Sequence, residues 1–442
     1  MNVTNDKVSS IFFQYSIPSV LGMLAISSAN IVDGFFIGNY VGDFGLAAIN
    51  ISLPIFSFLF GFALILAIGS SVVSGKLIGE GDIKNASNIF TKTIISITLF
   101  SFIICSFLFL NIENILYLFG ADENLTKIAI EYLSVILIFI PFLMIGVVLD
   151  YFVRVDNRPN LAFIALLSSA LINFILDYFL IVYLQKGIFG AGLATGISQL
   201  ALIFILLPHF FSKKATLKFV KPIGNYIQII KALYNGASEF VNEISIGIMT
   251  LIFNYVMIKN FGVEGIAAFT VIEYLLFIGV MISFGISDSL QPIISKNFGA
   301  KKSKRIEEFL KLAFISTSLV GFIMIILLLF IPDTLTNIFL EDTNYKTKQL
   351  VVNFVSFIWI IFLFDGINLV VSSYLTAIHK PLASMIIALS RSFIFPVFFL
   401  FTLPILFNEN GIFMSIPMAE FITFLIALIL YKRFSPKRLN KK

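Results

Sequence analysis

Cysteine, histidine and charge are scarce in this chain of 442 residues, and each scarcity excludes a class of protein. The single cysteine, Cys105, rules out an internal disulfide and a cysteine-based metal site. The two histidines, His209 and His379, lie at the ends of apolar runs, so only pairs of acids remain to form a catalytic constellation. No G-x-x-x-x-G-K-[ST] motif occurs, so the sequence predicts no ATP-binding domain. Charged residues make up 12% of the chain and hydrophobic residues 59%, and the mean hydropathy is +1.00. The core of a soluble protein does not need so large a share of apolar residues.

Long apolar runs occupy most of the chain. A run of about 18 or more apolar residues can span the hydrocarbon core of a membrane as a helix, whereas membrane-spanning strands alternate in stretches of roughly ten. The first run is too long for a cleavable signal and no cleavage site follows it. The sequence therefore predicts an all-α polytopic membrane protein. We predict twelve transmembrane helices, at approximately 11–37, 46–73, 88–110, 126–150, 160–184, 188–210, 234–258, 266–292, 306–331, 348–373, 382–406 and 412–431.

Lysine and arginine concentrate on one side of these spans. If both termini and the even-numbered connections share a side, the opposite side holds few of the 30 basic residues, namely Lys127, Lys186, Lys259, Lys346 and Lys348. Positively charged connections stay in the cytoplasm, so both termini are predicted to be cytoplasmic. The basic clusters face the anionic membrane surface and predict no nucleic-acid partner.

The second half of the chain repeats the first. "NYVGDFGLAAINISL" (39–53) matches "NFGVEGIAAFTVIEY" (260–274) at an offset of 220, and the same offset aligns "SGKLIGEGDIK" (74–84) with "ISKNFGAKKSK" (294–304). Each copy has an even number of spans, so the two copies insert the same way up. Such parallel repeats occur in secondary transporters, which open alternately to each side of the membrane.

The repeat divides the chain into two six-helix bundles around a predicted V-shaped central cavity. The predicted parts are an N-terminal lobe (1–212), a basic cytoplasmic linker with an interfacial helix (213–233), a C-terminal lobe (234–432) and a basic tail (433–442). The segment "GAGLATG" (190–196) superficially resembles a phosphate loop, but it lies in an apolar span and follows no strand. Close helix packing through Gly192 and Gly196 is the better interpretation.

Several carboxylates lie within the predicted spans or at their edges. Each costs about 2.5–3.5 kcal/mol at a helix centre, so an acid inside the membrane is a functional candidate by default. Asp150 precedes Arg154 by four residues, which predicts an ion pair along one helix. Asp288 lies near the end of its span, where we expect water to reach it. The remaining acids are Asp33, Asp177, Glu239, Glu243, Glu273, Asp365 and Glu420.

One group of polar residues belongs to the first half alone. Asn173 and Asp177 share a helix face at a spacing of four, Thr195 follows in the next span, and Asp33 lies deep in the first. Hard oxygen ligands of this kind suit a proton or Na⁺, although a hydrogen-bond network that only fixes packing is the alternative. In the second copy of the repeat, phenylalanine stands at the positions equivalent to both acids, with Phe253 equivalent to Asp33. A residue that only fixed packing should recur in both copies, so its absence from the second copy favours a functional role.

The second half has its own acids. Glu239, Glu243, Asp365 and Glu420 have no acidic counterpart in the first half, and Glu273 accompanies them. They are predicted to meet a cationic substrate or to carry protons. Arg391 is the one basic residue well inside a span, and it either lines a cationic groove or pairs with one of these acids.

The order and spacing of several motifs resemble the multidrug and toxic compound extrusion (MATE) family, in particular its DinF-like prokaryotic branch. The motifs are "YSIPSVLG" with Pro18, "NIVDGFFIGNYVG" with Asp33, "GLAAINISLP", "NFILDYFLI", "GAGLATGISQ", "ASEFVNEIS" and "QPIISKNFGA". The resemblance implies that Asp33, Asn173, Asp177 and Thr195 form a cation site in the N-terminal lobe, binding Na⁺ if the protein is sodium-coupled, and that the first helix bends at Pro18. In another branch of the family an acidic residue of the seventh span takes part in ion coupling, and Glu243 lies near the corresponding position of this chain.

The predicted protein is a cation-coupled antiporter, driven by Na⁺, H⁺ or both, which exports amphiphilic and often cationic drugs and toxic compounds by alternating access. It is expected to be a monomer in the cytoplasmic (inner) membrane of a prokaryote, surrounded by lipid, with no cofactor other than the coupling ion. The alternatives are a flippase for lipids or lipid-linked oligosaccharides, which would need a cationic groove, a membrane-embedded enzyme and a passive channel. We predict that the chain is not an enzyme.

Overall fold

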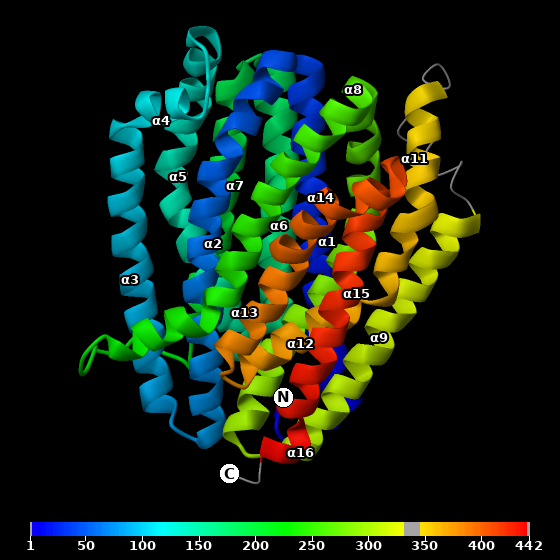
Figure 1. Ribbon diagram of the computed structural model, residues 1–442. Coiled ribbons are helices and arrows are strands. Elements are labelled where there is room, and N and C mark those ends of the chain that lie inside the picture. The colour runs from blue at the N-terminus through cyan, green and yellow to red at the C-terminus, as the bar shows by residue number, and fades with distance from the viewer. Residues whose placement is uncertain (1, 331–344, 440–442) are drawn as a thin grey trace. The chain divides into compact units, whose positions relative to one another are not determined.

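The computed structural model describes residues 2–330 and 345–439, which form helices and turns and contain no strand (Figure 1). The helices of the first half are α1 (Val8–Tyr40), α2 (Asp43–Glu80), α3 (Ile83–Leu110), α4 (Ile112–Leu118), α5 (Glu123–Val155), α6 (Pro159–Asp177), the π-helical η1 (Tyr178–Tyr183) and α7 (Gly187–Phe211). Those of the second half are α8 (Ile227–Gly299), α9 (Ser303–Phe330), α11 (Tyr345–Ile358), the 3-10 turn η2 (Trp359–Leu363), α12 (Asp365–Ala377), α13 (Pro381–Leu389), the π-helical η3 (Ser390–Ile394), α14 (Phe395–Phe407), α15 (Glu409–Arg433) and α16 (Pro436–Leu439).

Twelve crossings fit these helices. In the described residues, 11 helices are long and apolar enough to cross a membrane, and α8 alone is long enough to cross twice. Its helical geometry is interrupted at Gly262, whose φ of 70° and ψ of −153° lie outside the range that residues with a side chain adopt readily. Gly42, the counterpart at an offset of 220, has φ 89° and ψ −170° where α1 passes into α2. The predicted all-α fold of twelve spans is confirmed.

The chain forms two compact units whose limits do not follow the halves of the sequence. Unit 1 comprises Leu21–Phe240 with a short N-terminal stretch, and unit 2 comprises Thr4–Val20 together with Val241–Lys442. The first part of α1 thus belongs to unit 2, and the first part of α8 belongs to unit 1. The two division points are equivalent positions of the repeat, because Val20 and Phe240 differ by the same offset of 220.

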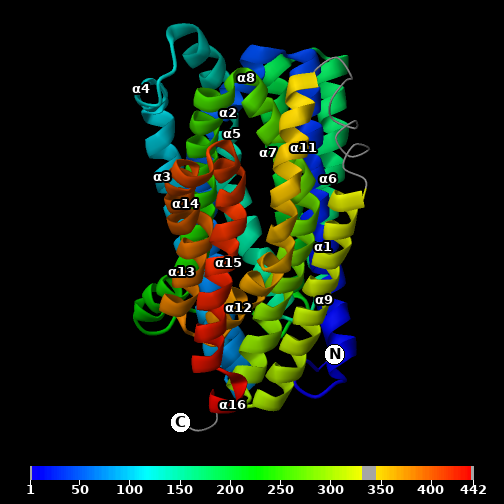
Figure 2. The same ribbon diagram turned by 45° about the vertical axis from the view of Figure 1, so that its right-hand side comes forward.

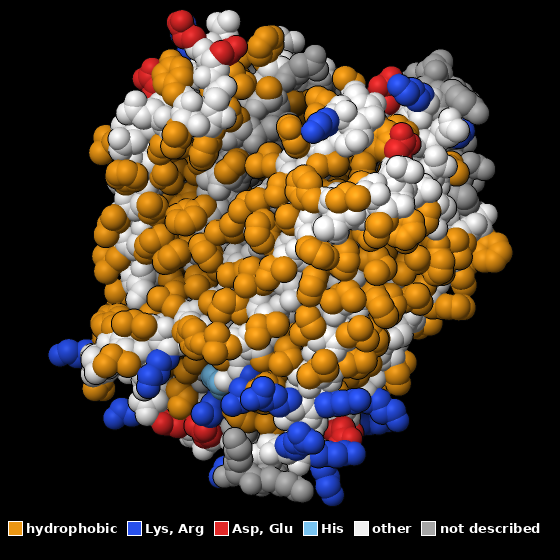
Figure 3. Space-filling view, viewed as in Figure 1, with side chains coloured by type: hydrophobic (Ala, Val, Ile, Leu, Met, Phe, Trp, Pro, Cys, Tyr) orange, Lys and Arg blue, Asp and Glu red, His pale blue; other side chains and the backbone are white. Residues whose placement is uncertain are grey.

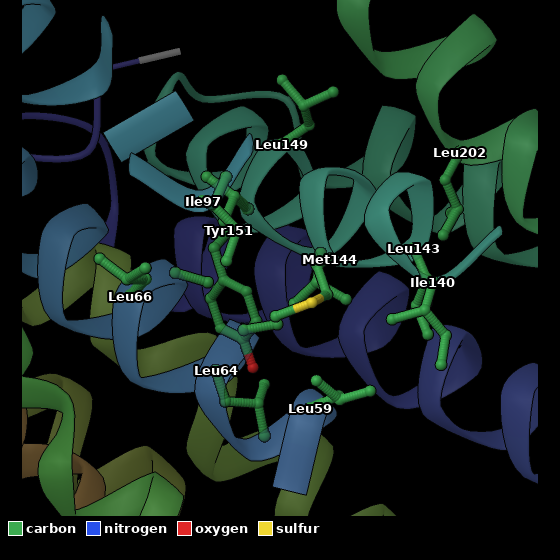
Figure 4. Packing of buried hydrophobic residues seen from close by; sticks show 14 of the residues in the cluster. Leu59, Leu64, Leu66, Ile97, Ile140, Leu143, Met144, Leu149, Tyr151 and Leu202 are labelled. Atoms are coloured by element: carbon green, nitrogen blue, oxygen red, sulfur yellow. The ribbon is translucent and has the colours of Figure 1, made fainter. Parts of the chain in front are cut away.

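The core of unit 1 lies along α5. Tyr151 and Met144 of α5 pack with Leu59, Leu64 and Leu66 of α2, as Figure 4 shows. Leu202 of α7 lies beside the next turns of α5, near Leu143 and Ile140. Lipid tails are as apolar as leucine, so these side chains hold the helices together by close van der Waals packing, and α5 is the central helix of this unit.

Glycines bring helices of unit 1 into close contact. A side chain at Gly196 would collide with the ring of Phe139 on α5, and a Cβ at Gly192 would lie 3.3 Å from the carbonyl oxygen of Tyr132. The predicted packing role of Gly192 and Gly196 is confirmed. Gly236, in the first part of α8, lies against the backbone of Ile65 in the same way.

The core of unit 2 is aromatic. Phe253 is 1% exposed and stacks on Phe269 with ring centroids 4.8 Å apart, and Phe354 lies edge-on to Phe413 at 4.8 Å. Helices α11 and α15, which carry the last two rings, are drawn in yellow and red in Figure 2. The repeat position that holds Asp33 in unit 1 therefore holds a core ring in unit 2.

The linker between the halves has no helix of its own. Residues 212–226 form turns and extended backbone, and the helical residues up to 233 are the first turns of α8. On the face drawn in Figure 3, apolar side chains cover the middle of both units, and Lys and Arg gather at one end of each.

Candidate cation site and buried charges

Two carboxylates of unit 1 face each other inside the bundle. Asp33 of α1 and Asp177, the last residue of α6, lie within hydrogen-bonding reach of each other. Asp177 is fully buried, and in the described structure Asp33 Oδ1 and both carboxylate oxygens of Asp177 are buried without a hydrogen-bond donor. Two like charges this close in a medium of low dielectric repel each other strongly. A proton or cation held between them would remove that repulsion.

Tyr132 of α5 lies close enough to both carboxylates to interact with them electrostatically. Its side chain is buried, and Gly192 allows α7 to approach it. Tyr132 was not predicted as a site residue, because nothing in the sequence distinguishes a tyrosine near a site from one that faces lipid. Its hydroxyl is the group of α5 best able to donate to a carboxylate of the pair.

Asn173 and Thr195, the other two predicted ligands, are also in unit 1. Asn173 is buried one turn before Asp177 on α6, and Thr195 Oγ1 is buried without a hydrogen-bond partner among the described residues. The backbone of Thr195 is held in place, because Ser198 donates to its carbonyl oxygen over 2.7 Å. No hydrogen bond joins either residue to the carboxylate pair in the part of the chain that the structure describes.

The four residues together match the ligand preference of Na⁺ or a proton. They offer carboxylate, amide and hydroxyl oxygens, which are hard donors, and the buried oxygens without partners cost free energy until something satisfies them. The described residues hold no cluster of three or more His, Cys, Asp or Glu, which does not favour a transition metal.

Two π-helical turns lie at buried charged residues, one in each unit. The turn η1 begins directly after Asp177, and η3 contains Arg391. A π turn places an extra residue in the helix and frees backbone groups from the regular ladder, and such turns are frequent at functional sites.

The buried charges of unit 2 form an ion-pair network. Arg391 donates through Nε to Glu420 over 2.7 Å and through Nη2 to Asp365, and Asn368 donates to the other carboxylate oxygen of Glu420 over 2.7 Å. Asp365 is fully buried and Glu420 nearly so. Of the two roles left open for Arg391, pairing with the acids is confirmed.

The other acids of the second half lie apart from this network. Glu273 reaches Thr250, whereas Glu243 is half-buried and forms no ion pair or hydrogen bond among the described residues. Glu239 is buried and belongs to unit 1, while the other four belong to unit 2. Among the described residues, neither Glu243 nor Glu273 forms an ion pair with Arg391.

Two further expectations have clear outcomes. Arg154 and Asp150 form a buried ion pair 2.7 Å long, as the spacing of four predicted. The expectation that water reaches Asp288 is wrong, because the side chain of Asp288, on α8, is only 2% exposed.

Pro18 lies inside the continuous helix α1, two residues before the division between the units.

Known proteins resemble this chain over nearly its whole length. Multidrug export protein MepA of Staphylococcus haemolyticus (strain JCSC1435) is 27% identical over 432 residues, which cover 96% of this chain and 94% of that protein. The protein of the same name from Staphylococcus aureus (strain N315) is 24% identical over 434 residues, with the same coverage of both.

Solved structures share the fold. An outward-facing multidrug resistance MATE family transporter of the MOP superfamily superposes with a TM-score of 0.93 at 20% identity, covering 100% of this chain and 98% of that one. A MOP superfamily transporter from Pyrococcus furiosus Vc1 gives a TM-score of 0.92 at 20% identity, with the same coverage. At this identity the likeness shows the fold alone.

The family model described as MatE matches residues 18–179 and 239–402, one segment in each half of the duplicated chain. The matched segments include Asp33, Asp177 and Arg391. The resemblance found in the motifs is thereby confirmed, together with the expectation that the chain is not an enzyme: this protein belongs to the MATE family of membrane transporters.

Proposed function

We propose that this protein is a cation-coupled antiporter that exports amphiphilic, often cationic drugs across the membrane. The observation that carries the proposal is the pair of Asp33 and Asp177, in which Asp177 is fully buried and three of the four carboxylate oxygens are buried without a donor among the described residues. The MepA proteins of staphylococci, named multidrug export proteins, support the export of drugs.

The carboxylate pair supplies the coupling. When both are ionised, the two charges repel each other in a largely buried site. Neutralised by H⁺ or bridged by Na⁺, they can approach and pack. The two states of the pair thus favour different arrangements of α1 and α6, the helices that carry it. Asp33 and Pro18 share α1, so a change at the pair would act on the helix whose predicted bending point is Pro18. A V-shaped substrate cavity and alternating access remain parts of the proposal.

The asymmetry of the buried charges supports one coupling site per chain. In unit 2 the acids Asp365 and Glu420 are already neutralised in part by Arg391, which is part of the chain and cannot leave. In unit 1 no cationic side chain contacts Asp33 or Asp177 among the described residues. An exchangeable cation is therefore best accommodated in unit 1.

The proposed setting is the cytoplasmic membrane of a bacterium, with both termini in the cytoplasm, lipid around the helices and a monomer as the working form. The basic ends of both units support this orientation. A flippase for lipid-linked oligosaccharides is not favoured, because Arg391 is engaged by two acids and does not line a cationic groove.

The test is drug counter-transport in proteoliposomes with Na⁺ and pH gradients imposed separately. Asp33→Asn and Asp177→Asn should each abolish gradient-driven export while dye binding remains. The double substitution should be no worse than either alone, because the two carboxylates act as one site. Glu131→Gln, an exposed acid of α5 next to Tyr132, is the matched control and should transport normally. Normal coupled transport by Asp33→Asn would refute the role of the pair.

A further inference from the structure

The linker of residues 212–226, called the strap below, is fastened to unit 1 along its inner side. Asp156, the residue that follows α5, accepts hydrogen bonds from the backbone N–H groups of Thr216 over 3.0 Å and of Leu217 over 3.2 Å. The same carboxylate lies 2.6 Å from Nε2 of His209 at the end of α7. The start of the strap is therefore tied to the ends of both α5 and α7.

Four polar side chains of α3 hold the rest of the strap. Asn88 both donates to the carbonyl oxygen of Ile223 and accepts from its N–H, each over 3.0 Å. Lys92, 1% exposed, donates to the carbonyl oxygens of Ile223 over 2.7 Å and Asn225 over 2.6 Å. Ser87 and Thr91 accept from backbone N–H groups between these points. A segment with this many backbone bonds to one helix has a fixed conformation, although it has no secondary structure.

The outer side of the strap is basic. Lys213, Lys214, Lys218 and Lys221 are exposed, and none of them forms an ion pair in the described part of the chain. Lys92 cannot contribute, because its ammonium group is buried under the strap. Four exposed positive charges on the strap therefore lack a counter-charge among the described residues.

Exposed apolar side chains follow the strap in the first turns of α8. Ile227, Ile230 and Tyr234 are 51%, 64% and 49% exposed, and their spacing of three and four residues places them along one face of the first turns of the helix. Ile223 at the end of the strap is 58% exposed. A row of unpaired lysines next to a stripe of exposed apolar side chains is the pattern of a segment lying at the boundary between lipid head groups and acyl chains.

We propose that the strap is a docking site for anionic phospholipid head groups, with the four lysines holding the phosphates and the stripe on α8 lying against the acyl chains. A free phosphate ion would leave the apolar stripe uncovered, whereas a phospholipid would cover both the lysines and the stripe. Because the strap is fixed to α3, α5 and α7, a bound lipid holds unit 1 at the membrane surface. The strap is thus a lipid anchor for this unit.

The test uses a tryptophan placed beside the lysines. Tyr226→Trp in a Trp359→Phe background gives one reporter, since Trp359 is the only tryptophan of the chain. The full-length protein is reconstituted in phosphatidylcholine vesicles with brominated phosphatidylglycerol or brominated phosphatidylcholine as the quencher. We expect phosphatidylglycerol to be preferred by at least about fivefold at low salt, and the preference to fall as salt is raised.

Two sets of substitutions test the assignment. Replacing Lys213, Lys214, Lys218 and Lys221 by Gln should reduce the preference to less than about twofold, with dye transport as the check that the protein is folded. Lys127→Gln with Lys259→Gln, at the opposite ends of the spans, should leave the preference unchanged. Equal quenching by the two lipids in the parent, or an unchanged preference in the strap variant, would overturn the proposal.

Lys92→Met provides a second, independent readout. It keeps all four outer lysines and removes only the ammonium group that holds the strap. We expect the preference for phosphatidylglycerol to fall by about twofold or more, because the lysines are no longer held in one arrangement. An unchanged preference would show that lipid binding does not need a fixed strap. It would refute the claim that the strap holds the four lysines in one arrangement for the lipid.

Discussion

Replacing Arg391 by methionine removes the central cation of the ion-pair network in unit 2. The side chain of Asp365 is fully buried and that of Glu420 is 5% exposed, whereas that of Arg391 is 14% exposed. The substitution leaves two carboxylates buried near each other, and each loses a charge-assisted hydrogen bond. Removing one partner from a buried ion pair costs about 3–5 kcal/mol, mainly because of the charge that remains.

This cost predicts a large change in thermal stability. For a unit of this size about 1 kcal/mol corresponds to 2–4 °C, so Arg391→Met should lower the Tm of the purified protein in detergent by roughly 10 °C. Arg391→Lys keeps the charge but cannot donate to both carboxylates in the same fork geometry. Its Tm should therefore lie between that of the parent protein and that of Arg391→Met.

A matched triple variant separates charge from packing. Adding Asp365→Asn and Glu420→Gln to Arg391→Met removes the stranded charges and should restore at least half of the lost Tm. If Arg391→Met melts within about 2 °C of the parent, the network is solvated and the magnitude derived above is wrong. If the triple variant is as unstable as the single one, the arginine acts through its packing.

Three further predictions concern separate features. Gly236→Ala should lower the Tm markedly, because the new methyl group meets the backbone of α2, whereas Gly34→Ala, with nothing within 4 Å, should not. With the only cysteine replaced by alanine, a cysteine at Lys127 should react with an impermeant maleimide in intact cells and one at Lys304 should not; the reverse would invert the orientation. Glu243→Gln should weaken export of cationic dyes and spare neutral compounds, since Glu243 has no ion-pair partner among the described residues; an equal loss for both would exclude a role in meeting the substrate's charge.

The architecture was predictable because it depends on features that a single sequence carries. Apolar runs longer than a membrane is thick can only be spanning helices, and the offset of 220 between the halves fixes their number and direction. The pairing of Asp150 with Arg154 was predictable for a related reason, since a spacing of four places two side chains on one helix face.

Contacts between distant parts of the chain were not predictable in this way. No periodicity places Tyr132 next to Asp33, and Arg391 had several acids as candidate partners. The burial of Asp288 was not predictable either, because closeness to the end of a span does not show whether neighbouring helices cover the side chain. The π turns at Asp177 and Arg391 have no signature in composition, since they depend on how neighbouring helices pack.

The division of α1 and α8 between the two units has a consequence for how the protein is made. Thr4–Val20 is synthesised before Leu21–Phe240, yet it belongs to a compact unit whose other residues begin at Val241. Unit 2 therefore cannot be completed until the second half of the chain has left the ribosome, and the opening of α1 has to wait in the membrane for it. In a homodimer of a single six-span repeat, the same arrangement would be a reciprocal domain swap, with each subunit lending the start of its first helix to the other. The duplicated gene keeps both sides of such an exchange in one polypeptide, so neither can be lost to a different partner.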